Sequence, residues 1–202
     1  MIDNNKMTVG DVVIALPSTG IHSNGFSLCR KVFDIDNNNP ELYVAREELD
    51  GKSIAEALLV PTKIYVKPVL ALLEKVNVKG ISHITGGGFY ENIPRMYPKS
   101  KDGKKQLISV IKRDSWDIPP VFGELIRRGA DINSIYNTFN MGIGFVLDVK
   151  AKDADAIIEM FNKNASKYAK EGIPQMKAYK IGYTKLSEGI AESQEERLIF
   201  ED

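Results

Sequence analysis

The chain has 202 residues, of which 43% are hydrophobic and 27% charged, so it is long enough to bury a core and polar enough for a soluble globular domain. Basic and acidic residues both number 27, which leaves no net charge to hold a nucleic acid or an anionic membrane. The single cysteine excludes an intrachain disulfide and favours a cytoplasmic location. No apolar run is long enough to span a bilayer, and the first ten residues lack the apolar stretch of a signal peptide.

The first predicted element is a buried strand over residues 11–17, an apolar and β-branched run that a proline closes. A turn with two glycines follows it. Apolar residues then recur on one face of a predicted helix over residues 26–33, for which Ser23 or Asn24 is the expected N-cap. Residues 34–52 are rich in Asn, Asp and Glu and are predicted to be mostly surface loop.

The next predicted helix spans residues 68–76 and begins at Pro68, because proline suits the first position of a helix. Strands are predicted over residues 79–85, 105–111, 142–149 and 178–184, and helices over residues 89–96, 119–128 and 152–162. Strands and helices alternate too irregularly for a doubly wound sheet. The predicted fold class is therefore α/β (α+β), a mixed β-sheet with helices packed on it.

Both histidines of the chain, His22 and His83, lie in glycine-containing loops that directly follow predicted strands. Ligands bind at the carboxyl ends of strands in open α/β sheets, and glycine lets backbone amides approach an oxyanion closely. The two loops are therefore candidates to surround one phosphate-bearing ligand. Their candidate contact residues are Ser18, Gly20, Ser23 and Asn24 in the first loop and Thr85, Gly86, Gly87 and Gly88 in the second.

For either loop alone, an ordinary turn whose histidine has a structural hydrogen bond explains the sequence as well as a ligand site does. Three consecutive glycines weaken this alternative, because ordering them costs backbone entropy. Asn140 offers a side-chain amide beside a glycine at the start of a predicted strand, and a local turn is the simpler explanation for it. The sequence contains no phosphate loop of the Walker type and no zinc-ligand spacing. The glycine loops hold no acidic pair for magnesium, so no metal site is predicted and a nucleoside triphosphate site is incomplete.

Four sequence strings carry a family resemblance: GDVVIALPSTGIHSNGFSL at residues 10–28, LVPTKIYVKPVL at 59–70, HITGGG at 83–88 with ENIPR at 91–95, and TFNMGIG at 138–144. In this order they resemble aminoimidazole ribonucleotide synthetase (phosphoribosylformylglycinamidine cyclo-ligase) from residue 10 to about residue 150. The string around His22 is shared with a superfamily that includes formylglycinamidine synthetase, thiamine-monophosphate kinase, selenophosphate synthetase and a hydrogenase maturation factor. The strings PTKIYVKP and ENIPR narrow the resemblance to the cyclo-ligase.

The resemblance implies a division of the chain into three parts. Residues 1–9 are a disordered or linker start, residues 10–187 are the C-terminal, substrate-binding domain, and residues 188–202 are a charged tail that is expected to be disordered. The family's N-terminal half, which provides the dimer barrel and most contacts to ATP and Mg²⁺, does not match any part of this sequence. The implied partners are that N-terminal domain and, in the full-length protein, a second subunit. The role of residues 165–176 is left open.

The implied reaction is phosphorylation of the formyl-amide oxygen of formylglycinamidine ribonucleotide by ATP, then attack of the amidine nitrogen and loss of phosphate. It yields aminoimidazole ribonucleotide in purine biosynthesis. By motif position, His22 and His83 are the catalytic candidates, and Asn24 and Asn140 contact the substrate. This chain alone is expected to be inactive. Two other readings stay open: a stand-alone module that binds a phosphorylated metabolite, and another ATP-dependent enzyme of the superfamily, such as a small-molecule kinase.

Overall fold

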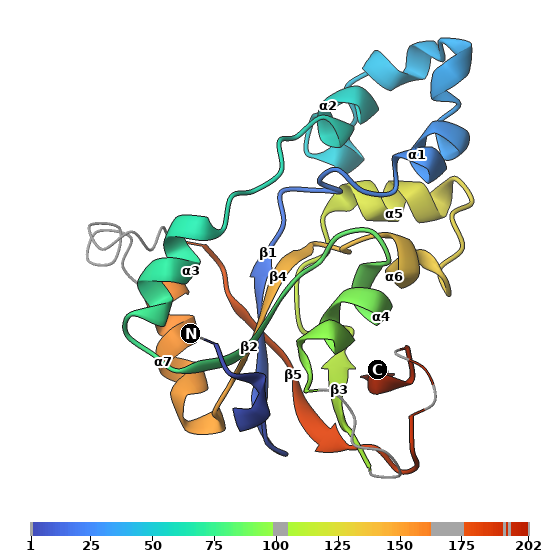
Figure 1. Ribbon diagram of the computed structural model, residues 1–202. Helices are drawn as coiled ribbons and strands as arrows, with labels where there is room; N and C mark the ends of the chain where they lie inside the picture. Colours follow the sequence, from blue (N-terminus) through green and yellow to red (C-terminus); the bar gives the residue numbers. More distant parts are fainter. Residues whose placement is uncertain (1, 99–104, 163–175, 192, 194, 202) are drawn as a thin grey trace.

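The computed structural model describes residues 2–98, 105–162, 176–191, 193 and 195–201 (Figure 1). Within these residues one six-stranded sheet has the order β2-β4-β1-β5-β3-β6. Its strands are β1 Val12–Pro17, β2 Val78–His83, β3 Leu107–Lys112, β4 Ile143–Val149, β5 Tyr179–Leu186 and β6 Leu198–Glu201. All neighbouring strands are antiparallel except β3 and β6, which are parallel, so the predicted mixed sheet with packed helices is confirmed.

Helices pack on both faces of the sheet (Figure 1). The α-helices of the described residues are α1 Phe26–Val32, α2 Ile54–Leu58, α3 Val66–Leu73, α4 Gly88–Asn92, α5 Pro120–Arg127, α6 Ile135–Thr138 and α7 Ala151–Asn162. Short 3₁₀ helices are η1 Asn4–Lys6, η2 Ile35–Asn37, η3 Pro40–Tyr43, η4 Glu47–Leu49, η5 Ile93–Met96 and η6 Glu195–Arg197. Helices α3 and α7 cover the face with Val12 and Ile14, and α4, α5 and α6 cover the face with Val13 and Ala15.

The direction of the strands explains where the two predicted loops meet. Strands β1 and β2 both pair antiparallel with β4, so they run the same way on either side of it. Their carboxyl ends therefore lie at one edge of the sheet, together with the amino end of β4. The backbone closes this arrangement, because the Ser18 amide donates to the Gly142 carbonyl at 2.8 Å and the Ile84 amide donates to the Gly144 carbonyl at 2.9 Å.

Three local predictions differ from the structure. Gly25 in the left-handed region is the N-cap of α1, with no side-chain cap, instead of Ser23 or Asn24. Helix α3 begins at Val66 instead of Pro68, because the preceding residues already turn into the helix. Helix α2 lies in residues 53–60, for which no element was predicted; Ser53 and Glu56 form a reciprocal capping box there, a signal that was present in the sequence.

Both ends of the chain are more ordered than predicted. Residues 4–6 form η1, and Met7 is only 4% exposed because its side chain packs over Gly80. The charged segment after residue 187 contains the apolar triplet Leu-Ile-Phe, which pairs with β3 as β6 and buries Leu198. Of the stretch 165–176, whose role was left open, all residues except Met176 lie outside the described part of the chain. No helix in the described parts of the chain is long and apolar enough to cross a membrane.

Candidate functional site

The two histidines lie side by side at the shared edge of β1, β2 and β4. Their ring centroids are 6.4 Å apart, and the Tyr65 ring lies 6.3 Å from His22 and 5.9 Å from His83. Phe145 of β4 completes the cluster at 5.3 Å from Tyr65. Gly144 makes this packing possible, because a side chain there would overlap the Tyr65 hydroxyl and approach the His22 ring within 2.8 Å.

His22 is buried, and its backbone has φ 57°, a left-handed conformation that is uncommon for a residue with a side chain. Its Nε2 accepts the backbone amides of Thr19 at 3.2 Å and Lys63 at 3.4 Å, which places the proton of the neutral ring on Nδ1. Burial, with the nearby positive charges of His83 and Lys63, lowers the pKa of His22 to about 4. The ring is therefore neutral near pH 7, and Nδ1 is a buried donor with no acceptor among the described residues.

His83 is the exposed member of the pair and the last residue of β2. Partial burial lowers its pKa from the ordinary value. The neighbouring Tyr65 is fixed by a hydrogen bond from its hydroxyl to the Pro17 carbonyl at 2.8 Å, and burial raises its pKa. The cluster thus pairs one enclosed, neutral imidazole with one that a ligand can reach from solvent.

Asn140, Ser18 and Gly20 form a buried hydrogen-bond network under the first loop. The Asn140 amide nitrogen donates to the Gly20 carbonyl at 2.9 Å, and its oxygen accepts the Gly142 amide at 2.9 Å and lies 3.1 Å from the Ser18 hydroxyl. Asn140 is 1% exposed. Its position corrects the expectation that it contacts substrate, because its amide is used to hold the loop.

Ser23 and Asn24 lie on the accessible side of the first loop. Ser23 is exposed and its hydroxyl is 3.0 Å from that of Thr62, while Asn24 is half-buried. The Asn24 side-chain oxygen is the group that faces Gly86, 3.8 Å from where a β-carbon on that glycine would be. The two loops predicted to share a ligand are therefore adjacent at this point.

The second loop is a glycine turn whose conformation depends on Asn92. Gly87 and Gly88 have φ 86° and 55°, and a side chain on Gly88 would overlap the Tyr136 carbonyl. The Asn92 amide nitrogen donates to the carbonyls of Gly88, Gly86 and Thr85 at 2.7, 3.1 and 3.3 Å. The carbonyls of the turn therefore point inward to Asn92, and the Gly88 amide donates to the Thr85 carbonyl at 3.1 Å.

Comparisons with known proteins identify the family of the chain. Residues 8–172 match the family described as AIR synthase related protein, C-terminal domain. The chain belongs to this family. Phosphoribosylformylglycinamidine cyclo-ligases from Clostridium acetobutylicum and Clostridium novyi are each 46% identical to it over 92% and 91% of its length. The chain spans about half the length of these curated relatives, 48% in both cases.

Solved structures of a hydrogenase maturation protein share the fold of this family member. The E. coli protein HypE has a TM-score of 0.51 at 16% identity, over 91% of this chain and 46% of its own. A second structure of hydrogenase maturation protein HypE has a TM-score of 0.53 at 13% identity, over 98% of this chain and 51% of its own. At these identities the likeness shows the fold alone.

Among the described residues, no group of three or more His, Cys, Asp or Glu side chains is placed to hold a metal ion. Sequence reasoning missed Tyr65, Lys63 and Asn92 as parts of the site. Tyr65 and Asn92 lie within the family-like strings, but no local pattern shows that they contact the histidine loops.

Replacing Asn92 by Asp is expected to loosen the glycine turn. The carboxylate keeps the size of the amide but cannot donate to the three carbonyls of Thr85, Gly86 and Gly88, so about 2 to 3 kcal/mol of stability is expected to be lost. Urea unfolding measures the loss, and hydrogen exchange at the Gly88 amide, which donates to the Thr85 carbonyl, locates it. Asn137→Asp, an exposed change nearby, is the matched control; equal exchange in both variants would contradict the role given to Asn92.

Proposed function

We propose that this chain is the C-terminal half of a phosphoribosylformylglycinamidine cyclo-ligase, which converts formylglycinamidine ribonucleotide and ATP to aminoimidazole ribonucleotide, ADP and phosphate. The observation that carries the proposal is the convergence of the two histidine loops, with ring centroids 6.4 Å apart, at one edge of the sheet. The names of the relatives support the reaction, and their greater length supports a second half that completes the enzyme.

The substrate phosphate binds in the glycine turn. The amides of Gly86 and Gly87 supply fixed dipoles toward its oxygens, and the Thr85 hydroxyl lies at the same turn. Asn24 and Ser23 approach from the facing loop, while Ser18, Gly20 and Asn140 hold that loop in place.

The two histidines have different roles in this proposal. His22 is neutral at physiological pH, and its Nε2 accepts the Thr19 and Lys63 amides, so it positions the first loop beside the substrate. His83 is accessible and transfers the proton that leaves the amidine nitrogen as the ring closes. As the amidine nitrogen bonds to the formyl carbon, the bond from that carbon to the phosphorylated oxygen breaks, and this oxygen leaves as part of inorganic phosphate.

The second half of the enzyme supplies most of the contacts to ATP and Mg²⁺ and the surface for homodimer formation. The N-terminal domain and the ribonucleotide are therefore the proposed partners, without nucleic acid or a membrane. A cytoplasmic location stays a prediction from the single cysteine.

A hybrid enzyme tests the proposed function. This chain replaces the matching half of the C. acetobutylicum cyclo-ligase, and ATP-dependent ring closure is measured. The hybrid is expected to turn over, His83→Ala within it is expected to lower kcat/KM by about 100-fold or more, and this chain alone is expected to show no activity. Ala156→Leu, an exposed change on α7, is the control. Turnover by the chain alone, or a soluble hybrid with no turnover, would contradict the proposal.

A further inference from the structure

A pocket of about 450 Å³ opens beside α5, apart from the two histidine loops. It is lined by side chains from the segment before α5, from α5 itself and from the turn that leads into α6. Its volume lies in the range of about 300 to 1,000 Å³ that is typical of small-molecule sites. The function proposed above makes no use of it.

Gly123 is the residue that keeps this pocket open. It lies inside α5, where glycine costs about 0.5 to 1 kcal/mol relative to alanine. Nothing lies within 4 Å of where its β-carbon would be, and its φ is outside the left-handed region. Neither packing nor backbone conformation requires a glycine here. The consequence of having glycine at this position is the open space beside α5, which a larger side chain would fill.

The lining of the pocket indicates the chemistry of its ligand. Ile118 and Ile132 are 40% and 61% exposed at the rim, and Tyr136 presents an aromatic ring. The Arg113 guanidinium lies 5.7 Å above the Tyr136 ring centroid and 4.9 Å above that of Phe200. A guanidinium fixed on aromatic faces favours an anionic group beside an apolar body.

We propose that this pocket binds a planar aromatic small molecule that carries one carboxylate or similar anionic group. The aromatic body packs between the isoleucines and Tyr136, and the anion lies beside Arg113. This inference is independent of the cyclo-ligase proposal, because it uses no residue of the histidine loops.

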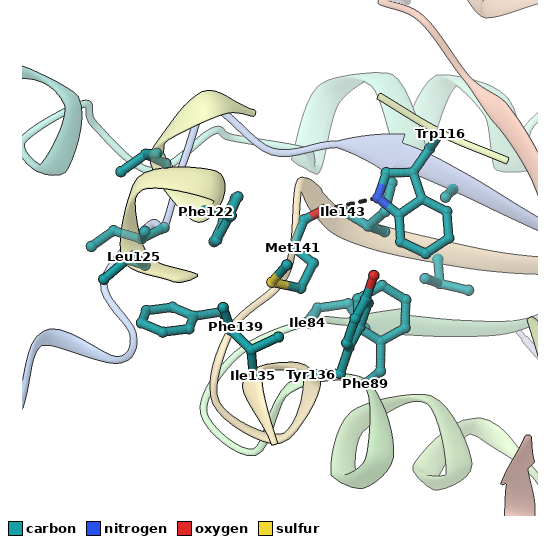
Figure 2. Packing of buried hydrophobic residues seen from close by; sticks show 14 of the residues in the cluster. Ile84, Phe89, Trp116, Phe122, Leu125, Ile135, Tyr136, Phe139, Met141 and Ile143 are labelled. Atoms are coloured by element: carbon teal, nitrogen blue, oxygen red, sulfur yellow. Dashed lines mark hydrogen bonds between the residues drawn. The ribbon is translucent and has the colours of Figure 1, made fainter. Parts of the chain in front are cut away.

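The pocket is lined in part by Met141, which follows Asn140 in the chain, so a bound ligand should be detectable at this segment. Met141 forms part of its wall, and the Met141 carbonyl accepts the Trp116 indole N–H at 2.8 Å (Figure 2). Pro119 lies 2.5 Å from where a β-carbon on Gly142 would be, so this wall contacts the segment whose Gly142 amide donates to the Asn140 side chain. A ligand is therefore expected to shift the amide resonances of Met141 and Gly142.

The test is an NMR titration of the chain with 1-naphthoate and with its neutral analogue 1-naphthamide. Saturable binding of 1-naphthoate with shifts at Met141 is expected. Gly123→Leu, which fills the pocket, is expected to weaken this binding at least tenfold. Ala156→Leu places the same side chain on the exposed face of α7 and is expected to leave the binding unchanged.

Arg113→Gln separates the charge from the apolar part of the proposal. This change is expected to weaken the binding of 1-naphthoate severalfold and to leave the binding of 1-naphthamide unchanged. Thermal unfolding checks that each variant is folded. The Gly123 variant is expected to fold, because a side chain at this position enters open space. No saturable binding, shifts confined to other surfaces, or equal binding by Gly123→Leu and Ala156→Leu would overturn the assignment.

Discussion

Replacing Asp148 by Asn is expected to stabilise the fold at pH 9 by about 3 kcal/mol or more and to leave its stability at pH 4 nearly unchanged. Asp148 is 0% exposed in β4, and neither carboxylate oxygen has a hydrogen-bond partner in the part of the chain that is described. Burial and the negative charge of Asp11 raise its pKa to about 8, although the nearby Lys79 ammonium opposes them. Lys79 itself bonds both Asp11 oxygens at 2.6 Å.

The sign of the pH dependence follows from the raised pKa of Asp148. Between about pH 4 and pH 8 the folded chain keeps the Asp148 proton, which the unfolded chain has lost, so this group makes the free energy of unfolding fall as pH rises. Asparagine cannot ionise, and the variant should lack this part of the slope. Urea unfolding from pH 4 to 9 measures it. Asp155→Asn, an exposed change on α7, is the control; the same slope in all three proteins would contradict a buried, protonated Asp148.

Replacing Gly144 by Ala is expected to disrupt the histidine cluster and to destabilise the fold by about 2 to 4 kcal/mol. The new methyl group overlaps the Tyr65 hydroxyl and lies 2.8 Å from the His22 ring, so Tyr65 must leave its hydrogen bond to the Pro17 carbonyl. Thermal unfolding measures the loss, and the histidine ring resonances report the displaced cluster.

Two further variants distinguish crowding at Gly144 from a general glycine effect. Gly123→Ala adds the same methyl group where nothing lies within 4 Å, and it should be neutral or slightly stabilising. Adding Tyr65→Phe to Gly144→Ala removes the crowded oxygen and should restore part of the stability. A Gly144→Ala protein with native stability and unchanged histidine resonances would show that the cluster does not depend on this glycine.

Much of the fold could be predicted because β1 and β4 are largely apolar runs with glycine or proline beside them. The strands β1, β2 and β4 lie close to their predicted ranges. The last strand was missed because acidic residues lie on both sides of its short apolar triplet. Composition alone therefore favours a solvated tail.

The candidate site was predictable only in part. The glycines and histidines indicate two loops, and antiparallel pairing of β1 and β2 with the same strand brings these loops together. Which side chains face a ligand depends on contacts between distant segments. The Asn140 side chain donates to the carbonyl of Gly20, 120 residues away in the chain. The Asn92 side chain donates to backbone carbonyls of the glycine turn, and no sequence pattern identifies such bonds.

Calorimetric titration of this chain with formylglycinamidine ribonucleotide tests the central claim most directly. The account predicts saturable binding that His83→Ala and Gly87→Ala each weaken about tenfold or more, a loss of at least about 1.4 kcal/mol, while Asp155→Asn leaves it unchanged. Gly87 has φ 86°, so its replacement strains the turn that holds the phosphate. No binding, or binding that neither change weakens, would contradict the placement of the substrate in these two loops.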